Sequence, residues 1–72
     1  MTLAEQFHEE GMQRGQVAAK QQYILEALMI RFDRVPEGLR EEIESIADTA
    51  KLQSLLRAAI RSSTLEQFAE AL

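Results

Sequence analysis

Apolar residues recur at helical spacing along the whole chain, and no stretch alternates with the period of a strand. The first helical pattern opens at Thr2 and continues to about Phe32. It ends before Val35-Pro36, because the residue that precedes a proline avoids the helical conformation. This pattern predicts one N-terminal helix of about 30 residues, roughly 45 Å long.

Three shorter helical patterns follow the long one. Pro36 suits the first turn of a second helix, and Asp48 suits the N-cap of a third. A capping-box pattern at Ser63–Glu66 opens a final helix. The expected fold is all-α, with one long N-terminal helix plus three short helices. Because a chain of 72 residues without cysteine buries little surface by itself, we expect a helical homodimer.

The helix lengths divide the chain into two parts. Short helices of about 8–14 residues cover only about half of a 45 Å helix. Residues 24–32 are apolar almost all round, whereas residues 5–22 are mostly Glu, Gln, Gly and Ala. We therefore expect a projecting arm with a degenerate Glu-Gly repeat at residues 1–22, and a small bundle at residues 23–72. The predicted bundle core comprises Ile24, Leu25, Leu28, Phe32, Leu39, Ile43, Ile46, Leu52, Leu55, Leu56, Ile60, Leu65, Phe68 and Leu72.

The long helix carries two apolar stripes. At 100° per residue, the first stripe contains Leu3, Phe7, Gly11, Ala18, Leu25, Leu28 and Phe32. The second stripe contains Met12, Ala19, Tyr23 and Ile30. A helix with two apolar stripes packs against two partners. We expect one partner to be the chain's own short helices and the other to be another chain. The predicted dimer or partner interface is Leu3, Phe7, Gly11, Met12, Gly15, Ala18, Ala19, Tyr23 and Ile30.

Gly11 and Gly15 interrupt an otherwise strong helical pattern, and each costs about 1 kcal/mol relative to alanine. Two interpretations remain open. Small residues four apart let two helix backbones approach closely, as in membrane dimers. Alternatively, the glycines are remnants of a repeat, tolerated because the arm is solvated.

The amino-acid composition limits which cofactors and partners the chain can be expected to bind. The chain has no cysteine, and its one histidine, His8, cannot form a metal site alone, so we expect no cofactor and no metal. A net charge of −4 makes nucleic acid an unlikely partner. No apolar run reaches the roughly 18 residues of a membrane span, and the N-terminus lacks an apolar signal core. We expect a cytoplasmic protein with no membrane partner.

Catalytic groups are missing from the sequence. There is no cysteine nucleophile, no serine at a suggestive spacing from histidine and an acid, and no glycine loop after a strand. Acidic residues cluster at Glu9-Glu10 and at residues 41–44, on helical faces that we expect to be exposed. The sequence therefore predicts a protein that is not an enzyme.

Three segments resemble the small domain that closes many proteins of the Rpn family, the recombination-promoting nuclease and putative transposase group. "EEGMQRGQ" (9–16) resembles the family's Glu-Gly tract, of which about two imperfect units stand here. "ILEALMIRFDRVPEGLREEIESI" (24–46) is similar to its helix, turn and second helix, with Asp33 where that turn usually has glycine. "LQSLLRAAIRSSTLEQFAEAL" (52–72) resembles its usual ending. The resemblance covers residues 5–72.

The resemblance implies a PD-(D/E)XK nuclease core upstream, and no catalytic residue carries over to this sequence. It also implies that such a C-terminal segment, when made separately, dimerises and restrains the full-length nuclease. The expected function is a non-catalytic interaction module that regulates or inhibits that nuclease. The alternatives are a small DNA-binding accessory of a transposase, with Arg57 and Arg61 on phosphate, or a plain tethering domain.

Overall fold

The computed structural model describes the backbone of residues 3–72 and the side chains of residues 14–72. The described backbone forms four helices: α1 (Leu3–Phe32), α2 (Glu37–Ser45), α3 (Thr49–Arg61) and α4 (Leu65–Glu70). The all-α prediction, with one long helix before three short ones, is confirmed.

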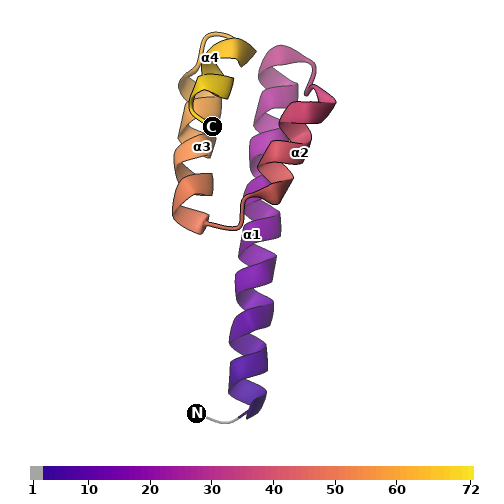
Figure 1. Ribbon diagram of the computed structural model, residues 1–72, viewed down its shortest axis with the longest axis vertical. Coiled ribbons are helices and arrows are strands. Elements are labelled where there is room, and N and C mark those ends of the chain that lie inside the picture. The colour runs from indigo at the N-terminus through magenta and orange to yellow at the C-terminus, as the bar shows by residue number, and fades with distance from the viewer. Residues whose placement is uncertain (1–2) are drawn as a thin grey trace.

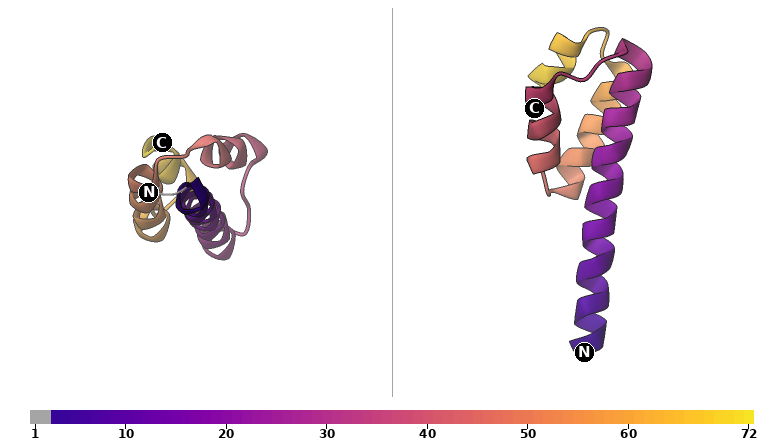
Figure 2. Two further views of the ribbon diagram at one scale, coloured as in Figure 1. Left: turned by 90° about the horizontal axis from the view of Figure 1, so that it is seen from below. Right: turned by 90° about the vertical axis from the view of Figure 1, so that its right-hand side faces the viewer.

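Helix α1 sets the shape of the molecule (Figure 1). The long axis measures 47 Å and the other two measure 18 Å each, which matches the length of a 30-residue helix. Helix α2 runs back along the second half of α1, and α3 then runs in the same direction as α1 (Figure 1). Helix α4 lies at the end of the bundle far from the N-terminus (Figure 1 and the right view of Figure 2). The first half of α1 extends beyond the bundle.

The core lies between the second half of α1 and the three short helices. α1 packs most extensively against α3 and less against α2, while α4 contacts α3. Full burial of one large apolar side chain contributes about 1.5–3 kcal/mol, so the buried apolar residues of the core contribute most of the stability. The buried apolar residues are Ile24, Leu25, Leu28, Ile43, Leu52, Leu55, Ala59, Leu65 and Phe68, and the partly buried ones packed against them include Phe32, Leu39, Ile46, Leu56 and Leu72.

Ile60 is a correction to the predicted core, because its side chain is 60% exposed. Helix α3 turns Leu52, Leu55 and Ala59 inward. Ile60 follows Ala59 and points about 100° away from it around the helix. The apolar spacing alone does not separate a residue at the edge of the buried face from one inside it.

The bundle begins earlier in α1 than the sequence predicts. Val17 packs against the core, and Lys20 and Gln21 form hydrogen bonds to α3 and to the end of α2. All three lie within residues 1–22, the segment predicted to project. We therefore use "the arm" for residues 3–16 of α1.

Side chains cap the N-termini of α3 and α4. The Asp48 carboxylate accepts hydrogen bonds from the backbone N–H groups of Ala50 (2.9 Å) and Lys51 (3.3 Å), as predicted. At α4 the predicted capping box is shifted by one residue. Thr64 is the N-cap and accepts from the Gln67 N–H at 3.0 Å, while Gln67 Oε1 accepts from the Ser63 N–H at 2.8 Å.

The turn after α1 depends on a left-handed residue. Asp33 has a φ of 62°, and its N–H donates to the Met29 carbonyl at 2.9 Å. This conformation ends α1 and starts the reversal towards Pro36, the N-cap of α2. Left-handed backbone costs a residue with a Cβ atom about 1–2 kcal/mol, with Asp among the least affected, and costs glycine little.

We predict that Asp33→Gly stabilises the protein by about 1 kcal/mol, because glycine removes this conformational strain. Asp33→Ala, the matched control, should destabilise the protein by a similar amount, since alanine adopts this backbone less readily than aspartate. Urea unfolding followed by circular dichroism measures both changes. A lower unfolding free energy for Asp33→Gly would contradict the role of this turn.

Candidate protein-interaction site

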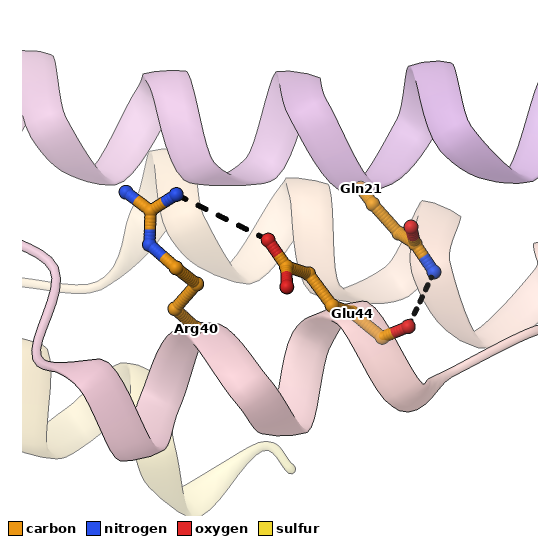
Figure 3. A network of polar contacts seen from close by, with 3 residues as sticks. All are labelled: Gln21, Arg40 and Glu44. Atoms are coloured by element: carbon orange, nitrogen blue, oxygen red, sulfur yellow. Dashed lines mark hydrogen bonds and ion pairs between the residues drawn. The ribbon is translucent and has the colours of Figure 1, made fainter.

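Helix α1 holds the C-terminal end of α2 through one amide side chain. Gln21 Nε2 donates to the carbonyl oxygens of Glu44 (3.1 Å) and Ile46 (2.8 Å), the first of which is drawn in Figure 3. The last four carbonyls of a helix have no partner within the helix. Gln21 therefore supplies two missing donors and fixes where the α2–α3 turn meets α1.

The ion pair beside Gln21 contributes much less. Arg40 Nη1 and Glu44 Oε1 are 4.0 Å apart, one helical turn from each other on α2 (Figure 3). Both side chains are about half exposed, and such a pair contributes about 0.3–0.5 kcal/mol. The position of α2 on α1 thus rests on Gln21 and on the buried Ile43.

Cationic side chains meet the C-terminal ends of α3 and α4. Arg31 Nη1 donates to the carbonyls of Ala59 (2.7 Å) and Ser62 (2.5 Å), and its guanidinium lies 4.9 Å from the centre of the Phe32 ring. Lys51 Nζ donates to the Ala71 carbonyl at 2.9 Å. Positive charge is favourable at a helix C-terminus. Each short helix therefore has its end held by a side chain from another helix.

Gln21→Glu should destabilise the protein by about 2 kcal/mol. The change removes two hydrogen bonds, each worth about 0.5–1.5 kcal/mol, and places negative charge beside carbonyl oxygens. Gln22→Glu adds the same charge at the next, exposed position and is the control, with an expected effect within about 0.5 kcal/mol. Thermal or urea unfolding compares the two variants. Equal stabilities would show that Gln21 does not hold α2.

The predicted interface residues do not share one face of α1. Tyr23 and Ile30, from the second stripe, are 56% and 73% exposed, and Ala19 is half-buried. Tyr23 and Ile30 point about 140–160° away from the buried Leu28 around the helix. Ala18 and Gly15 are exposed, but Ala18 belongs to the first stripe, on the side that faces the bundle. The remaining predicted interface residues, Leu3, Phe7, Gly11 and Met12, lie outside the side chains that the structure describes.

Among the described residues, no atom outside the backbone of α1 lies close to Gly15. A Cβ atom added at this position would meet no atom within 4 Å, and the same holds for Gly38 in α2. Packing inside one chain therefore does not require glycine at position 15. This observation agrees with a partner that approaches the arm closely, and it agrees equally with glycines that are remnants of a repeat.

A notch opens where the arm leaves the bundle. It has a volume of about 740 Å³ and lies between α1 and the turn that joins α2 to α3. The sequence predicts that half of α1 is uncovered, but it does not predict the notch, which depends on where Gln21 places that turn. The lining residues are Arg14, Gln16, Val17, Ala18, Gln21, Ala47, Asp48 and Thr49.

The charged surface shows no converging groups in the described part of the chain. Glu41, Glu42 and Glu44 are exposed on α2, and Arg57 and Arg61 are exposed on α3. Among the residues described, no three His, Asp or Glu side chains come together as a metal site would require. No described helix combines the length and the apolar character needed to cross a membrane. Comparisons with family models, curated proteins and solved structures find no match to this chain.

Proposed function

We propose that this chain is a non-catalytic interaction module that forms a homodimer through α1. The observation that carries the proposal is the length of α1 relative to the bundle, because the first half of α1 extends beyond the three short helices (Figure 1). Isolated helical segments shorter than about 12–15 residues are marginal in water. A second chain packed along the arm would supply the missing contacts.

The size of the bundle supports the same proposal. The buried core comes from short helices of 9, 13 and 6 residues and half of α1. Domains of this size fold with little surplus stability unless a disulfide, a metal or association adds to it. The chain has no cysteine, and association is the remaining common route.

We also propose a partner other than a second copy of the chain, and this proposal comes from the resemblance to the Rpn family. We propose that the chain pairs with the corresponding C-terminal segment of a full-length Rpn-type nuclease and restrains its activity. Support comes from the order of three segments, the Glu-Gly tract, the helix–turn–helix region and the Leu-rich ending, along residues 5–72. The left-handed Asp33 backbone adds to it, because glycine is the usual residue at that turn of the family.

Light scattering of the full chain at tens of micromolar should give twice the chain mass of 8.2 kDa. Gly15→Pro should shift this mass to the monomer, because proline inside a helix costs about 3 kcal/mol and interrupts the arm. The bundle contacts begin at Val17 and should survive, which circular dichroism and urea unfolding check. Gly38→Ala is the control and should remain dimeric. A monomer at all concentrations for the unmodified chain would refute the dimer.

Addition of the chain to a full-length Rpn-type nuclease should lower plasmid cleavage in proportion to the amount added, with saturation near equimolar protein. The Gly15→Pro variant should restrain cleavage much less, whereas Gly38→Ala should act like the unmodified chain. Gel densitometry of supercoiled and linear plasmid measures the rates. Unchanged cleavage with excess dimeric chain would refute the inhibitory role and leave the dimer standing.

A further inference from the structure

We propose that a second copy of this chain docks on the outer surface shared by α1 and α3, with the two copies parallel. This inference rests on the proposed homodimer through α1, and it specifies the surface and the orientation. We call this surface the α1–α3 face; it comprises Tyr23, Ala27, Ile30, Leu56 and Ile60. The exposed apolar residues, the positions of α2 and α4, and the charges at the edges of the face support the proposal.

Exposed apolar side chains gather on the α1–α3 face. Tyr23, Ile30 and Ile60 are three of the four large apolar side chains that the described part of the chain leaves exposed. Ala27 and Leu56 extend the apolar surface on each helix and are partly buried against the core. Apolar residues that gather in one exposed patch indicate a contact surface, whereas scattered single ones do not.

One hydrogen bond shows that these residues flank the contact between α1 and α3. Lys20 Nζ on α1 donates to Gln53 Oε1 on α3 at 2.8 Å. At 100° per residue, Tyr23 lies about 60° from Lys20 around α1, and Ile30 lies about 20° further. Ile60 lies about 20° from Gln53 around α3. The exposed residues of both helices therefore border the same line of contact.

The other short helices leave this face open. Gln21, which holds the end of α2, points about 160° away from Tyr23 around α1. Lys51, which holds the end of α4, points about 180° away from Ile60 around α3. The left view of Figure 2 shows α2 and α4 on the same side of α1 and α3. Neither helix therefore blocks a second chain that approaches from the other side.

The bonds between α1 and α3 also give the relative heights of their residues. Lys20 meets Gln53 near one end of the contact, and Arg31 donates to two carbonyl oxygens at the end of α3. Midway between these two points lie Glu26 on α1 and Arg57 on α3. Because the two helices run in the same direction and rise equally per residue, Glu26 and Arg57 are level with each other (Figure 1).

Glu26 and Arg57 occupy opposite edges of the α1–α3 face. Glu26 lies about 60° beyond Tyr23 around α1, on the side away from α3. Arg57 lies about 60° beyond Ile60 around α3, on the side away from α1. Both side chains are exposed. The face therefore has a negative edge and a positive edge at one height.

A parallel pair of chains matches these two edges. With a twofold axis that runs along the helices beside Tyr23 and Ile30, α1 of each copy lies against α1 and α3 of its partner. Glu26 of each copy then faces Arg57 of the other at the same height. An antiparallel pair centred on the face would instead set Glu26 beside Glu26 and Arg57 beside Arg57. The charges select the parallel dimer, while the apolar residues supply the affinity.

Parallel pairing also connects the α1–α3 face to the arm. Both copies of α1 leave the dimer at the same end, so their arms run side by side beyond the two bundles. The same axis that covers Tyr23 and Ile30 thus brings the arms together. It also covers Ile60, the apolar residue of α3 that the fold of one chain leaves exposed.

Substitutions on both helices test the surface. Ile60→Glu on α3 and Tyr23→Glu on α1 should each raise the dimer dissociation constant about tenfold or more, because each places a charge inside the apolar contact. Met29→Glu is the control and should leave the constant unchanged, since Met29 is the fourth exposed apolar residue and lies beside Arg40 of α2. Analytical ultracentrifugation measures the constants, and urea unfolding confirms that each variant folds.

The outcomes separate this surface from the dimer itself. An unmodified dimer that Ile60→Glu does not weaken would place α3 outside the interface and overturn the inference, and the proposed dimer would stand. A monomeric unmodified chain would refute both and leave the α1–α3 face to a different partner.

A charge exchange tests the orientation. At low salt, Glu26→Arg and Arg57→Glu should each raise the dissociation constant about tenfold, because each sets like charges against each other at two symmetric places. The double variant should return the constant to near its original value. Equal constants for both single variants and the unmodified chain would overturn the parallel arrangement.

Cysteine cross-linking measures the orientation directly, since the chain contains no cysteine of its own. Ile30→Cys should link to a second Ile30→Cys chain at least about tenfold faster than to a Tyr23→Cys chain, because positions 23 and 30 are about 10 Å apart along α1. Met29→Cys is the control and should link to itself slowly. Faster linking of Ile30→Cys to Tyr23→Cys would show an antiparallel dimer and overturn the inference.

Discussion

The structure depends on a difference in helix length: α1 has 30 residues, whereas the helices that pack on it, α2, α3 and α4, have 9, 13 and 6 residues. Helices bury apolar surface only where another element lies beside them, so the second half of α1 becomes the wall of a bundle and the first half does not. The apolar content agrees with this division, because residues 24–32 are rich in large apolar side chains and residues 5–22 are not. The bundle and the arm are thus two consequences of the same difference in length.

Long-range hydrogen bonds then fix where the short helices stop along α1. Gln21 and Arg31 lie ten residues apart on α1, and they hold the ends of α2 and α3 respectively. Because α2 and α3 run in opposite directions, their ends fall at opposite levels of the bundle (Figure 1). Gln21 therefore fixes the α2–α3 turn at the end of the bundle that is nearest the N-terminus of α1. The notch lies between this turn and the arm.

Much of the fold could be predicted from the sequence because its signals are local. Proline and N-cap residues mark helix boundaries, and the Asp48 cap was predicted and is confirmed. Thirteen of the predicted core positions are buried or packed against the core, and Ile60 is the exception. Its place is decided by the rotation of α3 against α1, which periodicity does not give. The notch was beyond prediction for a similar reason, since it requires the contact between Gln21 and Ile46, 25 residues apart in sequence.

The two stripes of α1 have different consequences once the bundle is in place. The second stripe, with Tyr23 and Ile30, is exposed along the bundle. In the first stripe, Leu25 and Leu28 are buried and Phe32 packs against the core, whereas Ala18 is exposed beside the notch. The intramolecular packing of α1 therefore treats its two stripes differently: within the bundle it buries Leu25 and Leu28 of the first stripe and leaves Tyr23 and Ile30 of the second stripe exposed.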